Sequence, residues 1–453
     1  MIGTSLSRWT LPHFAVALVF LLSAQGVIAA GWAYPAALVG APGTLAVVHL
    51  LTIGWLTVLI LGALLQFVPM VTARPASNGM MALLPLIGIC TGLAGVVAGF
   101  LSLDGTLPAF LVVGLPAGGL LVLITTTMAA APLAAALWHV RPMPLPIRFV
   151  LAGLGFLLAT AGLGVVFGAI FACPTVFPWG RVFAGGLRVH ITSGLLGWFT
   201  LTALGVSYRL LAMFMLAPDD RGRLGDVAFL LTAGGLALAW FAGLGRMLDL
   251  PLLDWLMQAG EAAAGLGVAV FLVDMLRLYR ARRRPALELH GITAAVSFGA
   301  LGVAILLLAS LRVTGRLEDL AGPVLYLLLF GWLSGLGLGQ LYKLIPFLTW
   351  LHRFGPLLGK APVPRIEDMV NERRAAPWFA LYFVAIAAGT VCGLLGWPSL
   401  WRVAIAAHLL ATVGIALELW RAWSWQPHNA AASRAPAPTW PSNRHRQQEG
   451  ALP

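Results

Sequence analysis

The sequence contains little charge: only 10% of its 453 residues are Asp, Glu, Lys or Arg, while 60% are hydrophobic. This balance, with a mean hydropathy of +0.91, excludes a soluble globular protein. The only cysteines are Cys90, Cys173 and Cys392, and no two form a C-x-x-C pair, so neither a disulfide framework nor a cysteine metal site is indicated. The sequence also lacks a Gly-rich phosphate loop, a nucleotide motif and a catalytic Ser or Cys elbow.

Long hydrophobic runs take the place of these motifs. Each run has about 20 residues or more, which is enough to cross ~30 Å of hydrocarbon as a helix. The sequence therefore predicts an all-α polytopic membrane protein with about twelve transmembrane helices. The predicted runs are 11–32, 45–70, 79–102, 107–138, 147–172, 184–214, 225–245, 251–280, 287–311, 321–350, 377–397 and 400–422.

The net charge of +12 reflects topology rather than nucleic-acid binding. Arg and Lys gather in alternate loops between the predicted helices, for example at Arg282, Arg283 and Arg284, whereas residues 33–44 have no charge. Cytoplasmic loops of membrane proteins carry such an excess of basic residues. We therefore expect a multi-pass protein of the bacterial inner (cytoplasmic) membrane, with both termini in the cytoplasm, the lipid bilayer as its main partner and no nucleic-acid partner.

A Gly-Trp pair occurs three times, roughly a third of the chain apart. The pairs are Gly54-Trp55, Gly197-Trp198 and Gly331-Trp332, and another glycine follows each first glycine eight residues later, at Gly62, Gly205 and Gly339. In a helix, these glycines share one face, where they allow a neighbouring helix to approach closely. An internal repeat of this kind outweighs any single residue in predicting the fold.

The repeat lies on predicted helices 2, 6 and 10, which divides the twelve helices into three groups of four. We predict three four-helix arcs related by a pseudo-threefold axis, forming a single transmembrane domain over residues 1–422. The segment 423–453 is rich in Ala, Pro and Arg and shows no apolar period. It is predicted to be a disordered cytoplasmic tail.

Three histidines fall inside predicted helices near the outer surface, where neutral imidazole suits heme iron, copper or zinc. His49 and His190 lie in the first turns of helices 2 and 6, and His408 lies about two turns into helix 12. The differing offsets of His49 and His190 from their Gly-Trp pairs are compatible with one shared ligand, but unrelated histidines would show the same pattern. The remaining histidines are assigned to helix ends, loops or the tail: His13, His139, His290, His352, His428 and His445.

Other ionisable residues inside the membrane are also candidates, because burying them there is costly. Glu261 on helix 8 has no Arg or Lys nearby in the sequence, so it is expected to be protonated or to assist the histidines as a metal ligand. Arg209 and Lys343 lie near the inner ends of helices 6 and 10. They are candidates for binding heme propionates or another anion, and snorkelling to the cytoplasmic boundary is the alternative interpretation.

These features together resemble subunit I of the heme–copper oxidases, and more closely its divergent relatives, which include the NnrS-type heme and copper membrane proteins. The resemblance rests on the twelve-helix arrangement, on Val48-His49-Leu50 with Gly54-Trp55, and on Arg188-Val189-His190 with Gly197-Trp198. It covers most of residues 10–422. It implies a heme–copper-oxidase-like fold, with His49 at the position of the helix 2 ligand of the low-spin heme and His190 at the position of the helix 6 copper ligand.

The departures from this family concern the oxygen-reducing site. Helix 7 has no histidine where the family carries two adjacent copper ligands, and helix 10 has none where the family carries its heme ligands. Helix 6 also lacks a Tyr or Glu placed to partner His190. A binuclear site cannot be assembled, so neither oxygen nor nitric oxide reduction is expected.

The leading hypothesis is therefore an integral membrane protein that binds heme, b-type by resemblance, and/or copper, without terminal oxidase activity. Its role would lie in respiration, the nitric-oxide response or cofactor handling, with respiratory-chain or cofactor-assembly membrane proteins as partners. Two alternatives remain open. One is a transporter of a small solute or protons, and the other is a cofactor-free structural subunit of a respiratory complex.

Overall fold

A computed structural model describes residues 2–35, 37–73, 82–175, 180–218, 223–247, 250 and 253–426. The described residues form helices and connecting segments, without a strand, and twelve of the helical spans are long and apolar enough to cross a membrane. This confirms the predicted all-α polytopic fold, with span boundaries within a few residues of those expected. Most of the predicted disordered tail lies outside the described residues.

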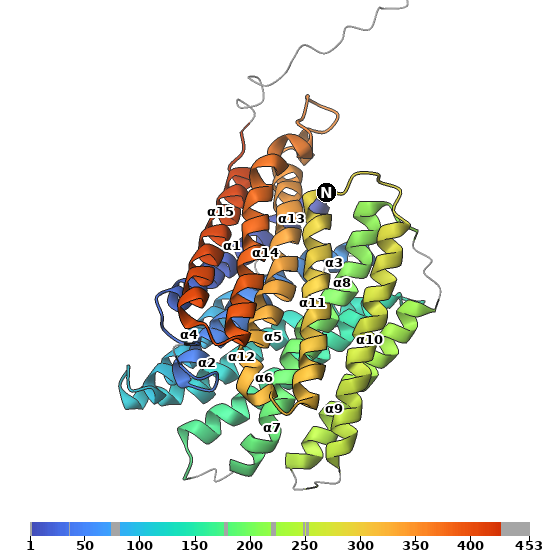
Figure 1. Ribbon diagram of the computed structural model, residues 1–453. Coiled ribbons are helices and arrows are strands. Elements are labelled where there is room, and N and C mark those ends of the chain that lie inside the picture. Colours follow the sequence, from blue (N-terminus) through green and yellow to red (C-terminus); the bar gives the residue numbers. More distant parts are fainter. Residues whose placement is uncertain are drawn as a thin grey trace, which may run out of the picture.

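The helices form one elongated bundle in which the described N-terminal and C-terminal segments lie at the same end (Figure 1). The long loop between α13 and α14 lies at that end as well. The elements are α1 (Ile2–Ala29), α2 (Pro42–His49), η1 (Leu50–Thr57), α3 (Val58–Thr72), α4 (Leu83–Leu103), η3 (Ala109–Val113), α5 (Gly114–Trp138), α6 (Leu145–Ala172), α7 (Gly180–Thr192), η4 (Ser193–Thr200), α8 (Leu201–Met215), α9 (Leu224–Met247), α10 (Asp254–Arg280), α11 (Leu289–Val313), α12 (Leu317–Tyr326), η6 (Leu327–Ser334), α13 (Gly335–Arg353), η7 (Gly355–Leu357), η8 (Ile366–Met369), α14 (Glu372–Leu394) and α15 (Pro398–Trp423).

The three spans that carry the repeat form the centre of the bundle. In their most apolar stretches 61%, 61% and 83% of the residues are buried, against 28–50% in the other nine spans. Each of the three contains an eight-residue π-helical segment, and each π-helical segment contains the Gly-Trp pair. The sequence predicted continuous helices here. Widened π turns are rare and are often found at functional sites.

The three tryptophans form a closed ring of hydrogen bonds around the pseudo-threefold axis. The Nε1–H of Trp55 donates to Ser334 Oγ at 2.8 Å, that of Trp332 donates to Thr200 Oγ1 at 3.2 Å, and that of Trp198 donates to Thr57 Oγ1 at 3.1 Å. Each hydroxyl lies two residues after the tryptophan of its own span. All three indole rings are buried, with exposed fractions of 0–1%. We call this arrangement the Trp ring.

The hydroxyls of the Trp ring also explain why the π turns are stable. Thr57, Thr200 and Ser334 donate to the carbonyl oxygens five residues earlier, at 2.9, 2.8 and 2.7 Å. In an ordinary α-helix such side chains bond back three or four residues, so the five-residue reach reflects the wider turn. Each of these three hydroxyls thus accepts from a neighbouring span and donates within its own, so none of the three is left unbonded in the apolar core.

The repeated glycines admit the first helix of each arc, as the shared glycine face predicted. A Cβ added to Gly54 would lie 2.5 Å from Phe20 of α1, and one added to Gly62 would lie 2.6 Å from His13. In the second arc the corresponding neighbours are Phe156 and Phe149 of α6, and in the third they are Ala300 and Thr293 of α11. The pseudo-threefold arrangement is therefore built from three equivalent helix contacts as well as from the Trp ring.

Candidate functional site

His49 is the last residue of α2 and directly precedes the first π-helical segment. Its Nδ1 is 2.7 Å from the carbonyl oxygen of Leu45, one turn earlier. The ring of Phe100, on α4, lies alongside it with centroids 5.0 Å apart and planes inclined by 35°. The packing of the first arc therefore fixes both the orientation of the imidazole and its tautomer.

His190 lies in the last turn of α7 before the second π-helical segment. Its Nδ1 is 3.1 Å from the carbonyl oxygen of Thr160 on α6, a partner 30 residues away in sequence. Phe167 packs edge-on against the ring at 5.5 Å. Two helices therefore hold this imidazole, and no residue of its own turn supplies the hydrogen bond.

The two imidazoles share the property that a heme or metal ligand needs. An Nδ1–H that donates to a carbonyl leaves the Nε2 lone pair free. A histidine that binds a metal through one ring nitrogen commonly makes a hydrogen bond of this kind with the other. No described residue hydrogen-bonds to Nε2 of either ring. The two side chains are close enough to interact electrostatically, and both keep partial accessibility although they lie deep in the bundle.

The helix beside His190 is loosely surrounded. Between Leu157 and Phe167 of α6, every residue is partly accessible and none is buried or fully exposed. A Cβ added to Gly164 would meet only the Cε1 of His190, at 3.4 Å. The hydroxyl of Thr160 is buried and has no hydrogen-bond partner among the described residues. Small side chains thus leave room and an unsatisfied polar atom next to the free imidazole.

These residues fit a heme better than a bare metal ion. Among the described residues, no three His, Cys, Asp or Glu side chains come together as a metal-binding group. A heme would need only one or two protein ligands for its iron, and His49 and His190, each with a free Nε2, would be the residues to supply them. The unsatisfied Thr160 hydroxyl and the open surroundings of α6 are also features that a bound group would explain.

His408 does not join this site. It is buried in the third arc, where Gln25 Nε2–H donates to its Nε2 at 3.0 Å and its Nδ1 is 3.0 Å from the hydroxyl of Tyr326. The rings of Phe330 and Tyr382 pack edge-on against it, each at 4.8 Å. Both ring nitrogens already have protein partners, so the role predicted for His408 as an assisting ligand finds no support in its geometry.

Glu261 has partners, contrary to the expectation from the sequence. It accepts from Arg188 Nε at 2.7 Å and lies 3.7 Å from Arg312. Both arginines come from other spans, which is why inspection of neighbouring residues missed them. Glu261 is therefore not isolated, and it belongs to an ion-pair group joining α7, α10 and α11.

Lys343 is also paired, since it bonds to Glu288, which additionally contacts Arg284. Its ammonium group lies 5.6 Å from the centre of the Phe214 ring. Arg209 follows Tyr208 on α8, and Tyr208 donates to Asp274 at 3.1 Å. Lys343 thus forms an ion pair at the end of the bundle where the chain termini lie. The alternative interpretation from the sequence was a side chain that only extends to the membrane boundary.

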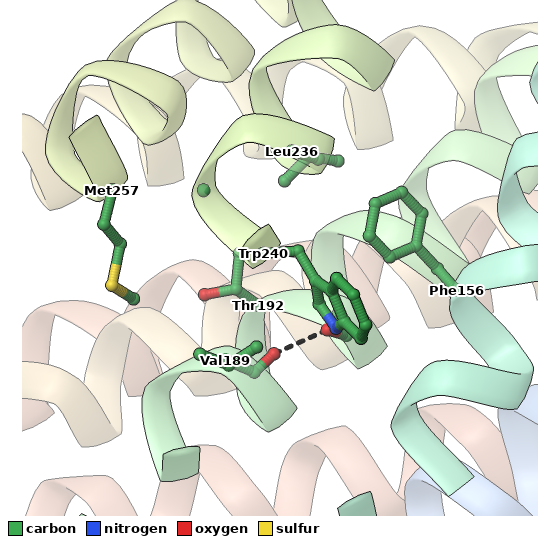
Figure 2. Close-up of a pocket in the computed structure, with 8 residues that line it drawn as sticks. Phe156, Val189, Thr192, Leu236, Trp240 and Met257 are labelled. Atoms are coloured by element: carbon green, nitrogen blue, oxygen red, sulfur yellow. Dashed lines mark hydrogen bonds between the residues drawn. The ribbon is translucent and has the colours of Figure 1, made fainter. Parts of the chain in front are cut away.

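The second arc contains a small cavity between α6, α7, α9 and α10. The side chains of Phe156, Leu236, Trp240 and Met257 surround it (Figure 2), and its volume is about 10 Å³. That is about the room of one water molecule, and the wall is apolar. The protein's own side chains therefore fill this part of the second arc.

Sequence reasoning missed the hydroxyls of the Trp ring and the glutamine bonded to His408. A signal for the hydroxyls was present, because each repeat reads Gly-Trp-x-Ser/Thr: Thr57, Thr200 and Ser334 all follow the pattern. Gln25 offered no comparable signal, because 383 residues separate it from His408. No protein-family model matches the chain, and no curated protein sequence matches it significantly.

Proposed function

We propose that the protein is an integral membrane heme-binding protein in which His49 and His190 are the ligands. The observation that carries the proposal is the pair of neighbouring imidazoles on different spans, each with Nδ1 bonded to a carbonyl and Nε2 free. The buried His408, in contrast, has both ring nitrogens bonded. A polar atom left unbonded inside a membrane protein costs free energy unless a ligand satisfies it.

Charge balance favours heme over copper as the bound group. A bare copper ion held by two neutral imidazoles would place uncompensated charge in an apolar region, which is costly. A porphyrin carries negative charge of its own and presents a flat apolar surface. The neighbouring aromatic rings of Phe100 and Phe167 offer apolar contacts to such a surface.

The same geometry favours electron transfer or heme handling over oxygen chemistry. A heme iron with two protein ligands exchanges electrons without offering a position to a substrate. The Leu45 and Thr160 carbonyls would orient the two imidazoles, and the aromatic side chains beside these rings would exclude water. The resemblance to divergent heme–copper oxidase relatives agrees with this proposal. The sequence also lacks the histidine ligands that an oxygen-reducing site would need, which agrees with it as well.

The cellular setting is part of the proposal. The Arg and Lys distribution supports a bacterial inner membrane protein with both termini in the cytoplasm. A role in respiration, the nitric-oxide response or cofactor handling would follow from heme binding there. The Trp ring fills the centre of the bundle with buried side chains, so it offers no support for transport along the central axis.

The test is an optical spectrum of detergent-purified protein, oxidised and then reduced with dithionite, with iron and copper analysis of the same sample. We expect a Soret band that shifts on reduction and is lost in His49→Ala and in His190→Ala. His139→Ala is the matched control, because His139 makes the same bond to a carbonyl one turn earlier but is exposed. Stoichiometric copper without a Soret band would mean that the bound group is copper and not heme. The absence of both heme and copper after reconstitution would refute the proposal.

A further inference from the structure

A row of polar side chains follows the contact between α11 and α13. His290, Thr293 and Ser297 occupy successive turns of α11. Thr293 meets α13 at Gly339, and Ser297 Oγ would lie 2.8 Å from a Cβ added to Gly335. We call the group His290, Thr293, Ser297, Gln340 and Lys343 the polar seam. It extends from the bundle end that carries Lys343 to the turn adjoining Ser334, where the Trp ring begins.

The polar seam contains several polar atoms that no described residue satisfies. His290 Nε2, Ser297 Oγ and both amide atoms of Gln340 are buried without a hydrogen-bond partner. Leaving such a group unpaired costs about 1–3 kcal/mol each, and native proteins seldom tolerate several together. These buried donors and acceptors on α11 and α13 are therefore available to an occupant that both donates and accepts hydrogen bonds.

The end of the polar seam near the chain termini is charged and has space. Glu288 contacts Lys343, Arg284 and His290 there, the last with 3.4 Å between Oε2 and Nδ1. A cavity of about 10 Å³ lies beside them, lined by Arg284, Glu288 and His290 among others, and part of its wall is polar. A polar cavity of this size accommodates about one water molecule.

Accessibility along the central spans follows a regular pattern further inward. In each span every third residue after the Trp ring is partly accessible, and the residues between these positions are buried. None of these nine residues is fully exposed, unlike Leu230 or Phe241 on an outer span, so they do not form a lipid-facing surface. They are Ile60, Ala63, Gln66, Ala203, Val206, Arg209, Gly337, Gln340 and Lys343.

Only the third arc is polar in the middle of this strip. Gln340 corresponds to Ala63 and Val206 in the other two spans, eight positions after the tryptophan in each case (55 to 63, 198 to 206, 332 to 340). The three arcs are therefore equivalent in backbone but differ in their ability to hold a polar molecule.

We propose that the polar seam is a binding site for a file of water molecules that enters beside Glu288 and Lys343 and ends below the Trp ring. Water satisfies the donors and acceptors of Gln340, Ser297 and His290, and such bridges are nearly as favourable as direct hydrogen bonds. Protons and other small hydrogen-bonding solutes then reach the level of the Trp ring from one side of the membrane only. The proposal does not rest on heme binding.

Cysteine accessibility tests this proposal on the full-length protein in lipid vesicles. In a variant without Cys90, Cys173 and Cys392, we would compare Gln340→Cys with Val206→Cys and with Leu338→Cys, a buried neighbour with an exposed fraction of 0%. The probe is a small cationic methanethiosulfonate, which reacts with thiolate in water. We expect labelling at position 340 to be at least tenfold faster than at 206 and 338. Equal rates at all three positions would overturn the proposal.

The sign of a stability change provides a second, independent test. In a dry seam, Gln340→Met removes an unsatisfied amide and raises the thermal unfolding midpoint. In a hydrated seam, the same change removes bonds to water and lowers the midpoint, which is the result we expect. Leu344→Met on the same helix controls for the methionine side chain itself, since such volume-conserving changes cost little. A higher midpoint for Gln340→Met than for the unchanged protein would contradict a water-filled seam.

Discussion

His49 and Tyr326 occupy the same place in two arcs, yet their surroundings differ. Each lies six residues before the tryptophan of its span (49 to 55, 326 to 332) and directly precedes a π-helical segment. Tyr326 bonds to His408, which also bonds to Gln25 of α1, so other protein side chains occupy the polar atoms at this position. His49 uses only Nδ1 and keeps Nε2 free.

The difference shows how one repeated framework supports two outcomes. The backbone is held by the Trp ring and the glycine contacts, which are common to all three arcs. The side chains near the π turns then determine whether a polar position is closed by the protein or left for a ligand. Unbonded polar atoms are costly in a membrane. A free ring nitrogen at His49, where the equivalent Tyr326 is hydrogen-bonded by the protein, therefore indicates a position available to a ligand.

The largest expected effect is the loss of the heme when the first-arc residue His49 is changed, but not when its third-arc equivalent Tyr326 is changed. His49→Ala should abolish the Soret band of the purified protein, because it removes a ligand, whereas Tyr326→Phe should leave the band intact. Heme content per chain, measured by absorbance against protein concentration, checks both variants. Equal loss of heme in the two variants would show that the arcs do not differ as proposed.

The reverse difference is expected for stability. His408→Ala removes the partner of both Gln25 and Tyr326 and leaves a cavity, so we expect it to lower the free energy of unfolding by about 2–5 kcal/mol. His49→Ala removes a partly accessible ring with one local hydrogen bond and should cost less. Thermal unfolding in detergent, with both proteins free of heme, gives the comparison, and a larger loss for His49→Ala would contradict it.

The Trp ring, common to all arcs, should be sensitive to a single hydroxyl. Thr200→Val leaves the Nε1–H of Trp332 without its acceptor, which should cost about 1–3 kcal/mol. Thr202→Val is the matched control, because the Thr202 hydroxyl is buried two residues away without a partner. We expect unfolding at a lower temperature for Thr200→Val only. Similar midpoints for the two variants would remove the Trp ring as a stabilising element.

A smaller effect of pH is expected at the mouth of the polar seam. Burial raises the pKa of Glu288, but the hydrogen bond from Lys343 and the positive charges of Lys343, His290 and Arg284 together lower it below its ordinary value. A carboxyl group with a lowered pKa stabilises the fold above its unfolded-state pKa, and this contribution is lost as the pH falls through the folded-state pKa.

Glu288→Gln should therefore destabilise the protein at neutral pH and differ less from the unchanged protein in acid. Thermal unfolding midpoints measured from pH 7 down to about pH 3 follow the difference across the ordinary titration range of glutamate. Asp254→Asn is a control at the opposite end of the bundle, where Asp254 pairs with Arg246. A difference for Glu288→Gln that grows toward acid would show that the sign of the shift is wrong.

Much of the fold could be predicted because it depends on local composition. Hydrophobic runs identified the twelve spans, and the Gly-Trp repeat identified the three central ones, since close helix contacts need glycine at fixed spacing. The π turns could not be predicted from helical periodicity, because they arise from hydroxyl bonds such as Thr57 to Thr52 and from contacts between spans. Their sequence signal becomes apparent only once the ring is known.

The candidate site was only partly predictable for a related reason. His49 and His190 could be singled out because each lies near the start of a central span. The pairing of Glu261 with Arg188 across 73 residues depends on helix packing, as does the bond between Gln25 and His408. Spacing in the sequence cannot show which polar groups will find hydrogen-bond partners through tertiary contacts. Such partners are what distinguish Tyr326 from His49.

The most direct test of the account is the heme content and spin state of the reconstituted protein. If His49 and His190 both ligate the heme iron, we predict one heme per chain with a six-coordinate low-spin iron. Either single alanine variant should then lose the heme, whereas His408→Ala should keep the low-spin spectrum. A low-spin heme that persists in both His49→Ala and His190→Ala would contradict the account.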